Sequence, residues 1–167
     1  MPKLKNQNRR KNIVRTIVRL LTERNFTLAT AESCTGGLIA HRITNVPGAS
    51  KTFLGGVVAY SNEVKRIFLG VRTKTLSRHG AVSAAVAREM AVGAREKFGA
   101  DFAIAVTGIA GPGGGTKSKP VGTVFIALAD GSGTVLERKM YPSGRVLFKR
   151  DTANRALKLL RSRLVET

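Results

Sequence analysis

The hydrophobic positions along this chain alternate between the spacing of helices and that of buried strands. Between residues 12 and 25, apolar side chains recur every third or fourth position with arginines on the opposite side, which predicts an amphipathic helix packed on a core. The apolar positions of this helix are Ile13, Val14, Ile17, Val18 and Leu21. Apolar runs typical of buried strands follow at residues 26–31, 53–60 and 101–108.

Two further helices are predicted between capping residues. The first begins at Ser61 and Asn62 and ends at Gly70, and the second begins at Ser83 and ends at Gly99. In each case a hydroxyl side chain precedes the helical pattern and a glycine follows it, which is the usual asymmetry of helix ends.

The remaining helices have less sharply marked ends. Residues 33–44 are expected to form a helix that opens at Ser33, and His79 is expected in a turn. A final helix is predicted over residues 146–164. Its inward positions are expected to be Leu147, Ala156, Leu157, Leu160 and Leu164.

The alternation of strands and helices predicts an α/β protein. Residues 122–129 and 134–140 flank the turn sequence "DGSG" and are expected to form a β-hairpin. A hairpin beside helix-connected strands gives a mixed, mostly parallel sheet with helices on both faces, and therefore a single three-layer domain. We expect this domain to span residues 13–167, preceded by a flexible basic extension at residues 1–12.

The composition limits the class of protein. The chain has 167 residues, of which 43% are hydrophobic, which suits one packed domain. No apolar run reaches the roughly 18 to 20 residues that a membrane helix needs, and the basic start has no apolar segment behind it as a signal peptide would. The single cysteine excludes an internal disulfide and fits a reducing compartment, so we expect a cytoplasmic protein without membrane association.

The net charge is strongly positive. There are 29 Lys and Arg against 10 Asp and Glu, which gives +19. Residues 1–24 carry eight basic residues against one acid, and residues 138–163 carry nine against one. Such a field attracts nucleic acid, acidic lipid or phosphorylated small molecules, but it is equally consistent with a solvated surface that keeps the protein soluble.

The stretch "TGIAGPGGGTKSKPVGTV" contains the only long segment without a secondary-structure pattern, residues 108–120. Its glycines allow tight turns that expose several backbone N–H groups, and it follows a predicted strand, where ligands bind in open α/β sheets. Lys117 and Lys119 could add charge for a phosphate. The segment fits neither the Walker pattern nor the dinucleotide fingerprint, so a ligand-binding loop and a mobile surface loop both remain open.

A possible nucleophile lies in "TAESCTGGLIA", residues 30–40. A serine nucleophile at Ser33 needs a base, and His41 would lie roughly 12 Å away along the expected helix, too far for a hydrogen bond. A Ser-His-Asp triad is thus open only through His79. A lysine base is an alternative if burial or nearby positive charge lowers its pKa. Cys34 is a competing nucleophile, and a simple N-cap is the plain structural explanation of Ser33.

Four blocks of this sequence resemble the CinA C-terminal domain family, the competence/damage-inducible CinA proteins with their stand-alone PncC-type members. The blocks are "TAESCTGGLIA", "NVPGASKTFLGGVVAYSNEVK", "HGAVS" and "TGIAGPGGGTKSKPVGTV". The resemblance implies a nicotinamide-nucleotide amidohydrolase, which converts nicotinamide mononucleotide and water into nicotinate mononucleotide and ammonia. It places the catalytic serine, tyrosine and lysine of the family at Ser33, Tyr60 and Lys65, and the nucleotide site at residues 107–112.

With this resemblance, Lys65, helped by Tyr60, is expected to take the Ser33 proton, and backbone N–H groups at residues 34–37 are expected to hold the oxyanion. Arg145 or Lys119 is expected to hold the phosphate. The substrate-binding residues are therefore predicted to be Cys34, Thr35, Gly36, Gly37, Thr107, Gly108, Gly111, Lys119 and Arg145. No metal or cofactor is expected, and relatives suggest a homo-oligomer.

Two other functions remain open. The first is a non-catalytic module that binds nucleic acid or a DNA-repair partner through the basic surface, although the chain has no Trp and only two Tyr for base stacking. The second is a hydrolase that depends on Cys34 in place of Ser33.

Overall fold

The structure, a computed structural model, describes residues 2–167, with side chains described from Ile13 onward. The expectation of a flexible extension over residues 1–12 lies outside the fully described residues and stays a prediction. The helices and strands, in chain order, are α1 (Pro2–Glu23), β1 (Leu28–Glu32), α2 (Leu38–Thr44), the 3-10 turn η1 (Ala49–Lys51), β2 (Phe53–Val58), α3 (Asn62–Leu69), α4 (Thr73–His79), α5 (Ala84–Phe98), β3 (Phe102–Gly108), β4 (Thr123–Asp130), β5 (Gly133–Met140) and α6 (Arg145–Glu166). None of the described helices has the length and apolar character needed to cross a lipid bilayer.

The five strands form one open, mixed sheet in the order β2-β1-β3-β4-β5. β1 runs parallel to both of its neighbours, β2 and β3, whereas β4 runs antiparallel to β3 and to β5. Four strands therefore point one way and β4 alone opposes them. The predicted α/β domain with a hairpin at its end is confirmed.

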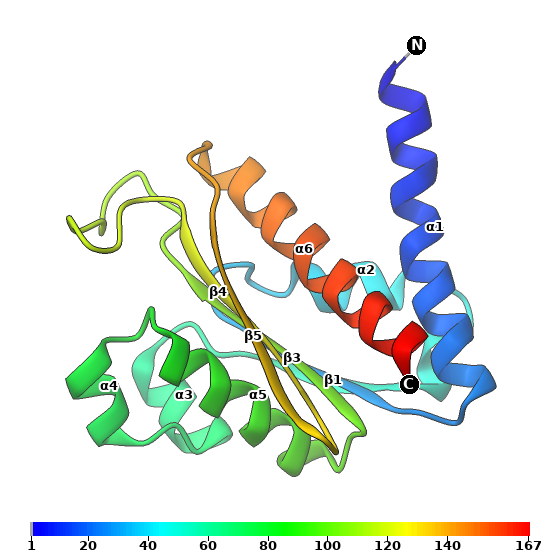
Figure 1. Cartoon of the computed structure of the whole chain (residues 1–167), viewed down its shortest axis with the longest axis horizontal. Helices are drawn as coiled ribbons and strands as arrows, with labels where there is room; N and C mark the ends of the chain where they lie inside the picture. Colours follow the sequence, from blue (N-terminus) through cyan, green and yellow to red (C-terminus); the bar gives the residue numbers. More distant parts are fainter. Residues whose placement is uncertain (1) are drawn as a thin grey trace.

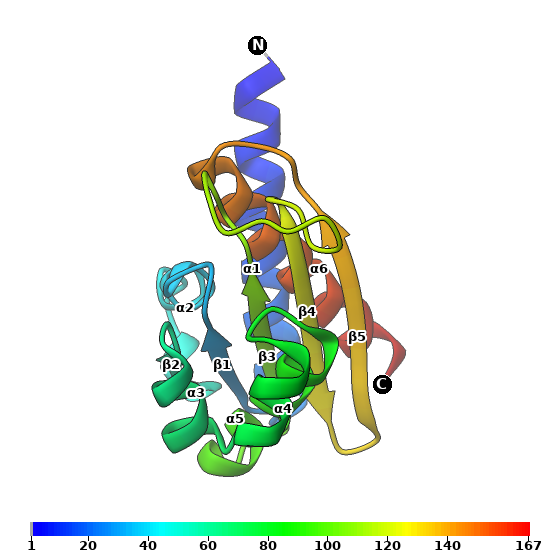
Figure 2. The same ribbon diagram turned by 90° about the vertical axis from the view of Figure 1, so that its left-hand side faces the viewer.

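Helices cover both faces of the sheet (Figures 1 and 2). α1, α2 and α6 lie on one face, and α3, α4 and α5 lie on the other. Along β3, Phe102, Ile104 and Val106 enter the core under α1 and α6, while Ala103 and Ala105 enter the core under α5. The small alanines allow α5 to lie close to the sheet, since side-chain size sets the distance between packed layers.

α5 also fixes the position of α3 by a close contact. A Cβ on Gly93 of α5 would lie 1.8 Å from the carbonyl oxygen of Leu69 at the end of α3, so no larger residue fits there. The caps of both helices are those predicted, with Ser61 and Gly70 on α3 and Ser83 and Gly99 on α5.

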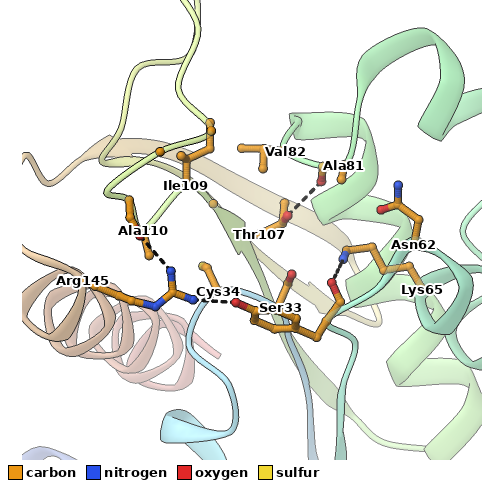
Figure 3. A pocket seen from close by; sticks show the side chains of 15 residues that line it. Ser33, Cys34, Asn62, Lys65, Ala81, Val82, Thr107, Ile109, Ala110 and Arg145 are labelled. Atoms are coloured by element: carbon orange, nitrogen blue, oxygen red, sulfur yellow. Dashed lines mark hydrogen bonds between the residues drawn. The ribbon is translucent and has the colours of Figure 1, made fainter.

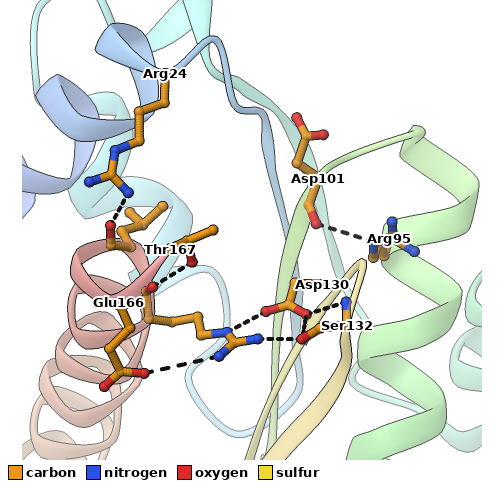
Figure 4. Close-up of polar contacts among 9 residues, drawn as sticks. Arg24, Arg95, Asp101, Asp130, Ser132, Glu166 and Thr167 are labelled. Carbon is orange, nitrogen blue, oxygen red and sulfur yellow. Dashed lines mark hydrogen bonds and ion pairs between the residues drawn. The ribbon is translucent and has the colours of Figure 1, made fainter.

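The C-terminal end of α6 is tied to the hairpin by polar contacts (Figure 4). Arg163 donates to the Asp130 carboxylate at 2.6 Å and also to the Ser132 hydroxyl. Burial raises the pKa of Asp130, but the hydrogen bonds from Arg163 and Ser132 outweigh it and lower that pKa to about 2. Arg24 of α1 donates to the carbonyl of Leu164, which joins α1 to the same end of α6.

The helix expected from Ser33 begins later than predicted. α2 starts at Leu38, and residues 33–37 form a turn. Gly36 and Gly37 adopt positive φ values of 61° and 92°, which a right-handed helix does not contain. Ser33 is therefore not the N-cap of α2.

Two smaller expectations are also wrong. Leu147 is 44% exposed, because its neighbour Phe148 takes the buried position in the first turn of α6. The other four predicted inward positions of this helix are fully buried. His79 lies at the end of α4, a short helix that the sequence pattern did not indicate.

Candidate active site

A pocket of about 260 Å³ opens where the parallel strands β1, β2 and β3 end (Figure 3). β1 leads to Ser33 and Cys34, β2 leads to Tyr60, and β3 contributes Thr107 and Gly108. The strand ends are level because β1 pairs in parallel with both neighbours, and this edge is where open α/β sheets bind ligands.

Backbone hydrogen bonds hold Ser33 against β3 and within its own turn. The Ser33 N–H donates to the carbonyl of Val106 on β3 at 3.0 Å, and its own carbonyl accepts from the N–H of Gly36 at 3.2 Å. The Ser33 side chain points into the pocket (Figure 3) while the residue is only 8% exposed. The backbone of Ser33 is thus held in place, and its hydroxyl faces the pocket.

Lys65 is the largest fully buried polar side chain that the pocket contains. It is 2% exposed, and its Nζ donates to the carbonyls of Ala59 at 2.8 Å and Tyr60 at 3.3 Å. Burial lowers the pKa of Lys65, and among the described residues no carboxylate forms an ion pair with it. A lysine in such surroundings loses its proton more readily than an exposed one and can act as a base.

Burial has the opposite consequence for Cys34, because it makes the thiol less reactive. The side chain is 5% exposed, and burial raises the pKa of its thiol to about 12, with the negative charge of Glu32 adding to the effect. A thiol in this range is protonated at neutral pH, whereas a cysteine nucleophile reacts as the thiolate. The raised pKa of the thiol therefore favours Ser33 over Cys34 as the nucleophile.

Tyr60 and Arg145 close the mouth of the pocket. The Arg145 guanidinium donates to the Tyr60 hydroxyl at 2.5 Å and to the carbonyl of Gly111 at 2.8 Å (Figure 3). Arg145 thus joins the end of β2 to the loop after β3. The Tyr60 hydroxyl does not contact Lys65 in this arrangement, and the two residues meet only through the Tyr60 carbonyl.

The glycine-rich loop, residues 109–122, forms the other wall of the pocket. Thr107, just before it, donates to the carbonyl of Ala81 at 2.8 Å. The far end of the loop is anchored away from the pocket, since Lys119 donates to the carbonyl of His79 at 2.7 Å and Arg138 donates to the carbonyl of Ser118 at 2.8 Å. The loop is an ordered wall in this structure, with Ile109, Ala110, Gly111, Gly113 and Gly114 facing the pocket.

The structure brings together most of the residues that the sequence analysis selected. Those that line the pocket are Ser33, Cys34, Tyr60, Lys65, Thr107, Gly108, Gly111 and Arg145. Four others do not line it: Thr35, Gly36, Gly37 and Lys119. The Thr35 hydroxyl donates to the Glu32 carboxylate. The Lys119 ammonium donates to the end of α4, so the expected phosphate contact of Lys119 has no support in the geometry.

Several residues near the pocket were not found from the sequence. Asn62 lines it from the first turn of α3, and Glu32 binds the turn that carries Ser33. The ammonium of Lys149 lies 3.4 Å from the place that a Cβ on Gly36 would occupy. Lys149 follows Arg145 by four residues, which puts both cations on one face of α6, and this spacing was the signal that could have identified it.

Neither histidine lines the pocket. His41 is exposed on α2, where its ring contacts the Asn45 side chain, and His79 is exposed at the end of α4. A Ser-His-Asp triad is therefore not formed. In the described part of the chain, no three His, Cys, Asp or Glu side chains gather as potential metal ligands.

The chain is similar to proteins of one family along nearly its whole length. The sequence model of the CinA C-terminal domain matches residues 10–164. A CinA-like protein from Geobacter sulfurreducens is 54% identical over 149 residues, which are 89% of this chain and 36% of that protein. A putative competence-damage inducible protein from Desulforudis audaxviator is 47% identical over 89% of this chain and 36% of its own length. The chain thus spans about a third of the length of these curated relatives.

Solved structures have the same fold. The competence/damage inducible protein CihA from Agrobacterium tumefaciens superposes with a TM-score of 0.89 and 42% identity, over 92% of this chain and 94% of that one. A CinA superfamily protein from Klebsiella pneumoniae superposes with a TM-score of 0.90 and 34% identity, over 95% and 99% of the two chains. By its sequence and by its fold, the chain belongs to the CinA C-terminal domain family.

Proposed function

We propose that this protein is an amidohydrolase that converts nicotinamide mononucleotide and water into nicotinate mononucleotide and ammonia. The observation that carries the proposal is the buried Lys65, with a lowered pKa and no acidic partner, beside the accessible hydroxyl of Ser33 in one pocket. A lysine that can be neutral and a hydroxyl nucleophile are the two groups that Ser-Lys hydrolysis requires.

The reaction proceeds in two halves. The Ser33 Oγ attacks the carboxamide carbon while its proton passes to the Lys65 Nζ, and the resulting tetrahedral intermediate expels ammonia after Lys65 returns that proton to the leaving nitrogen. This leaves an ester between Ser33 and the nicotinoyl group. Water then attacks the ester, gives a proton to Lys65 and from there to Ser33, and releases the acid.

The turn after β1 supplies donors for the oxyanion. The Gly36 N–H is already bonded to the Ser33 carbonyl, whereas no backbone carbonyl of the described chain accepts from the N–H groups of Cys34 and Thr35. Free N–H groups next to the nucleophile suit the negative oxygen of a tetrahedral intermediate. Of the four residues expected to supply these donors, Cys34 lines the pocket, so its N–H is the donor that we assign to the oxyanion.

The charges around the pocket favour an anionic substrate. The lining residues include the cation Arg145, and no Asp or Glu of the described chain is among them. Arg145 presents a planar guanidinium at the mouth, and Lys149 lies one turn further along α6. We assign the phosphate of the substrate to Arg145, assisted by Lys149, because a guanidinium can bind two phosphate oxygens at once.

A second candidate function is the binding of a polyanion such as nucleic acid. It is supported by the net charge of +19 and by three exposed basic side chains on the packed helices α1 and α6, Arg15, Lys158 and Arg161, which form no ion pair within the described residues. Its test is the affinity for duplex and single-stranded DNA at increasing salt, which falls steeply where phosphate contacts carry the binding.

The test of the amidohydrolase is ammonia release from nicotinamide mononucleotide by the purified protein. Ser33→Ala is expected to abolish release, and Cys34→Ala is expected to retain it. Release that survives in Ser33→Ala would move the nucleophile elsewhere. A folded wild-type protein without any release would overturn the proposed activity and favour the binding function.

A further inference from the structure

Glu32, the last residue of β1, is a buried carboxylate that does not line the pocket. It is 1% exposed, and among the described residues no cation forms an ion pair with it. A buried carboxylate is costly unless hydrogen bonds satisfy it. Glu32 is therefore expected to have a specific set of donors.

These donors all lie in the segment that follows Ser33. The Glu32 carboxylate accepts from the Thr35 hydroxyl at 2.6 Å, from the Ile39 N–H at 3.0 Å and from the Ala40 N–H at 2.8 Å. The two N–H groups belong to the first turn of α2, where a helix leaves its amides without internal partners. One side chain therefore holds both the middle of the turn and the start of the next helix.

The same residue also fixes the turn through its backbone. The Glu32 carbonyl accepts from the N–H of Ala59 at 2.8 Å, and the carbonyl of Ala59 accepts from Lys65 Nζ at 2.8 Å. A short chain of hydrogen bonds thus runs from the residue before the nucleophile to the proposed base. The relative position of Ser33 and Lys65 depends on this chain.

We propose that Glu32 is a positioning residue for the nucleophile. Its carboxylate fixes the turn of residues 33–37, and thereby the direction of the Ser33 hydroxyl and of the N–H groups that follow it. This inference rests on the proposed function of Ser33, but it concerns a residue that touches neither the substrate nor the reacting atoms.

The carboxylate form is essential for this role. Three donors point at two oxygens, and a Glu32→Gln change replaces one of those oxygens with an NH₂ group that faces donors and cannot accept from them. The turn of residues 33–37 then has to move, because the NH₂ group and the donors that face it repel one another. A displacement of about 1 Å of a reacting group can cost roughly 100-fold in rate.

A purely structural role is the rival explanation, and the chain offers a matched control for it. Asp101 lies beside the opposite end of β1, where its carboxylate accepts from the N–H and the hydroxyl of Thr27 at 2.7 and 2.8 Å (Asp101 is labelled in Figure 4). Asp101→Asn thus removes a similar carboxylate contact from the residue that precedes β1, at the end of the strand opposite the turn. It is expected to destabilise the fold without moving Ser33.

The experiment compares Glu32→Gln, Thr35→Val, Thr35→Ser and Asp101→Asn with the wild-type protein. It measures kcat and KM for nicotinamide mononucleotide, the melting temperature, and the rate at which phenylmethanesulfonyl fluoride modifies Ser33. Glu32→Gln is expected to lower kcat by roughly 30- to 100-fold with KM within about twofold, and to slow the modification of Ser33 similarly. Thr35→Val is expected to lower both rates by about 5- to 10-fold, and Thr35→Ser, which keeps the hydroxyl, to restore them.

The outcomes separate the positioning role from the proposed function. The positioning role would be overturned if the wild type, Glu32→Gln and Thr35→Val had equal modification rates and equal kcat values. It would also be overturned if Asp101→Asn lost as much kcat as Glu32→Gln at a similar melting temperature. If Glu32→Gln fails to fold, Thr35→Val and Thr35→Ser decide the question by the same comparison. A wild type that releases no ammonia, while its Ser33 is modified faster than in Glu32→Gln, would sustain the positioning role and overturn only the proposed substrate.

Discussion

The two walls of the pocket are built differently. The nucleophile wall consists of Ser33, Cys34 and Lys65, all at most 8% exposed, and is held by backbone hydrogen bonds and by a buried carboxylate. The opposite wall is the glycine-rich loop, residues 109–122, whose tip is exposed and whose anchors are two long cationic side chains, Lys119 and Arg138. Arg145 bonds to both walls at the mouth.

This difference suggests that the two walls have different roles in catalysis and in substrate binding. Groups that transfer protons need fixed geometry, which the dense packing at the ends of β1 and β3 provides. A wall of exposed backbone with few buried contacts opens at lower free energy and can adjust to a ligand. Changes in the nucleophile wall are therefore expected to lower kcat, and changes in the glycine-rich wall are expected to raise KM.

The largest effect is expected from Lys65→Met, which removes the base. We expect kcat to fall by roughly 10³-fold or more while KM changes little, because general-base catalysis is lost and the mouth of the pocket is untouched. Lys65→Arg is expected to be equally inactive, since an arginine keeps the charge but does not release its proton. Steady-state ammonia release measures both variants. An active Lys65→Arg protein would contradict a base role and indicate that the residue acts only as a cation.

The pH dependence of kcat/KM and of stability in the wild type tests the role of Lys65 in the nucleophile wall. Burial lowers the pKa of Lys65, so the neutral, active form increases as the pH rises through that lowered pKa, and kcat/KM is expected to rise with it to a plateau. Between the lowered pKa of Lys65 and its ordinary value of about 10.4, the unfolded state binds more protons than the folded state. The wild type is therefore expected to gain stability relative to Lys65→Met as the pH rises through this range. Profiles of kcat/KM and of the free energy of unfolding give the result. A kcat/KM that stays flat from about pH 6 to pH 10 would contradict the assignment.

The next effect tests the residue that joins the two walls. Arg145→Met removes the hydrogen bonds to Tyr60 and Gly111 and the charge assigned to the phosphate, and is expected to raise KM for nicotinamide mononucleotide by about 10- to 100-fold with kcat within a few-fold. The control is nicotinamide riboside, which lacks the phosphate. The preference of the wild type for the phosphorylated substrate is expected to shrink in Arg145→Met. An unchanged preference would place the phosphate elsewhere.

The sequence predicted features that depend on neighbouring residues and missed those that depend on distant ones. The caps Ser61 and Ser83 were found because each side chain binds an N–H three residues away. The start of α2 was misplaced because its capping side chain, Glu32, reaches seven and eight residues along the chain across a turn with two glycines at positive φ.

Long cationic side chains were the least predictable part of the site. Lys119 and Arg145 both looked like phosphate ligands, but only Arg145 lies at the pocket. The ammonium of Lys119 is taken by the end of α4, a helix that the pattern did not indicate. Ser33 and Lys65, by contrast, were assigned through the family resemblance, and the packing of β1 against β2 brings them into one pocket.

A smaller effect is expected at the anchor of the glycine-rich wall. Lys119→Met removes the hydrogen bond to the carbonyl of His79, and is expected to raise KM about two- to fivefold without a change in kcat. Hydrogen exchange at residues 109–122 is expected to become faster. Lys117→Met is the matched control, because Lys117 is an exposed neighbour that forms no ion pair or hydrogen bond within the described chain. Equal KM values for the two variants would mean that the anchor does not set the shape of the wall.

The smallest effect on activity is expected away from both walls, at Asp130. The pKa of this carboxyl is about 2 in the folded state, below its ordinary value, so its contact with Arg163 stabilises the fold at neutral pH and is lost as the pH falls through about 2. Asp130→Asn is expected to lower the free energy of unfolding by about 1 kcal/mol at pH 7, and the difference from the wild type is expected to vanish in acid. Chemical denaturation across the pH range measures this, with kcat and KM unchanged. A change in kcat would show that the hairpin end of α6 is coupled to the nucleophile wall, and that the two walls are not as independent as their contacts suggest.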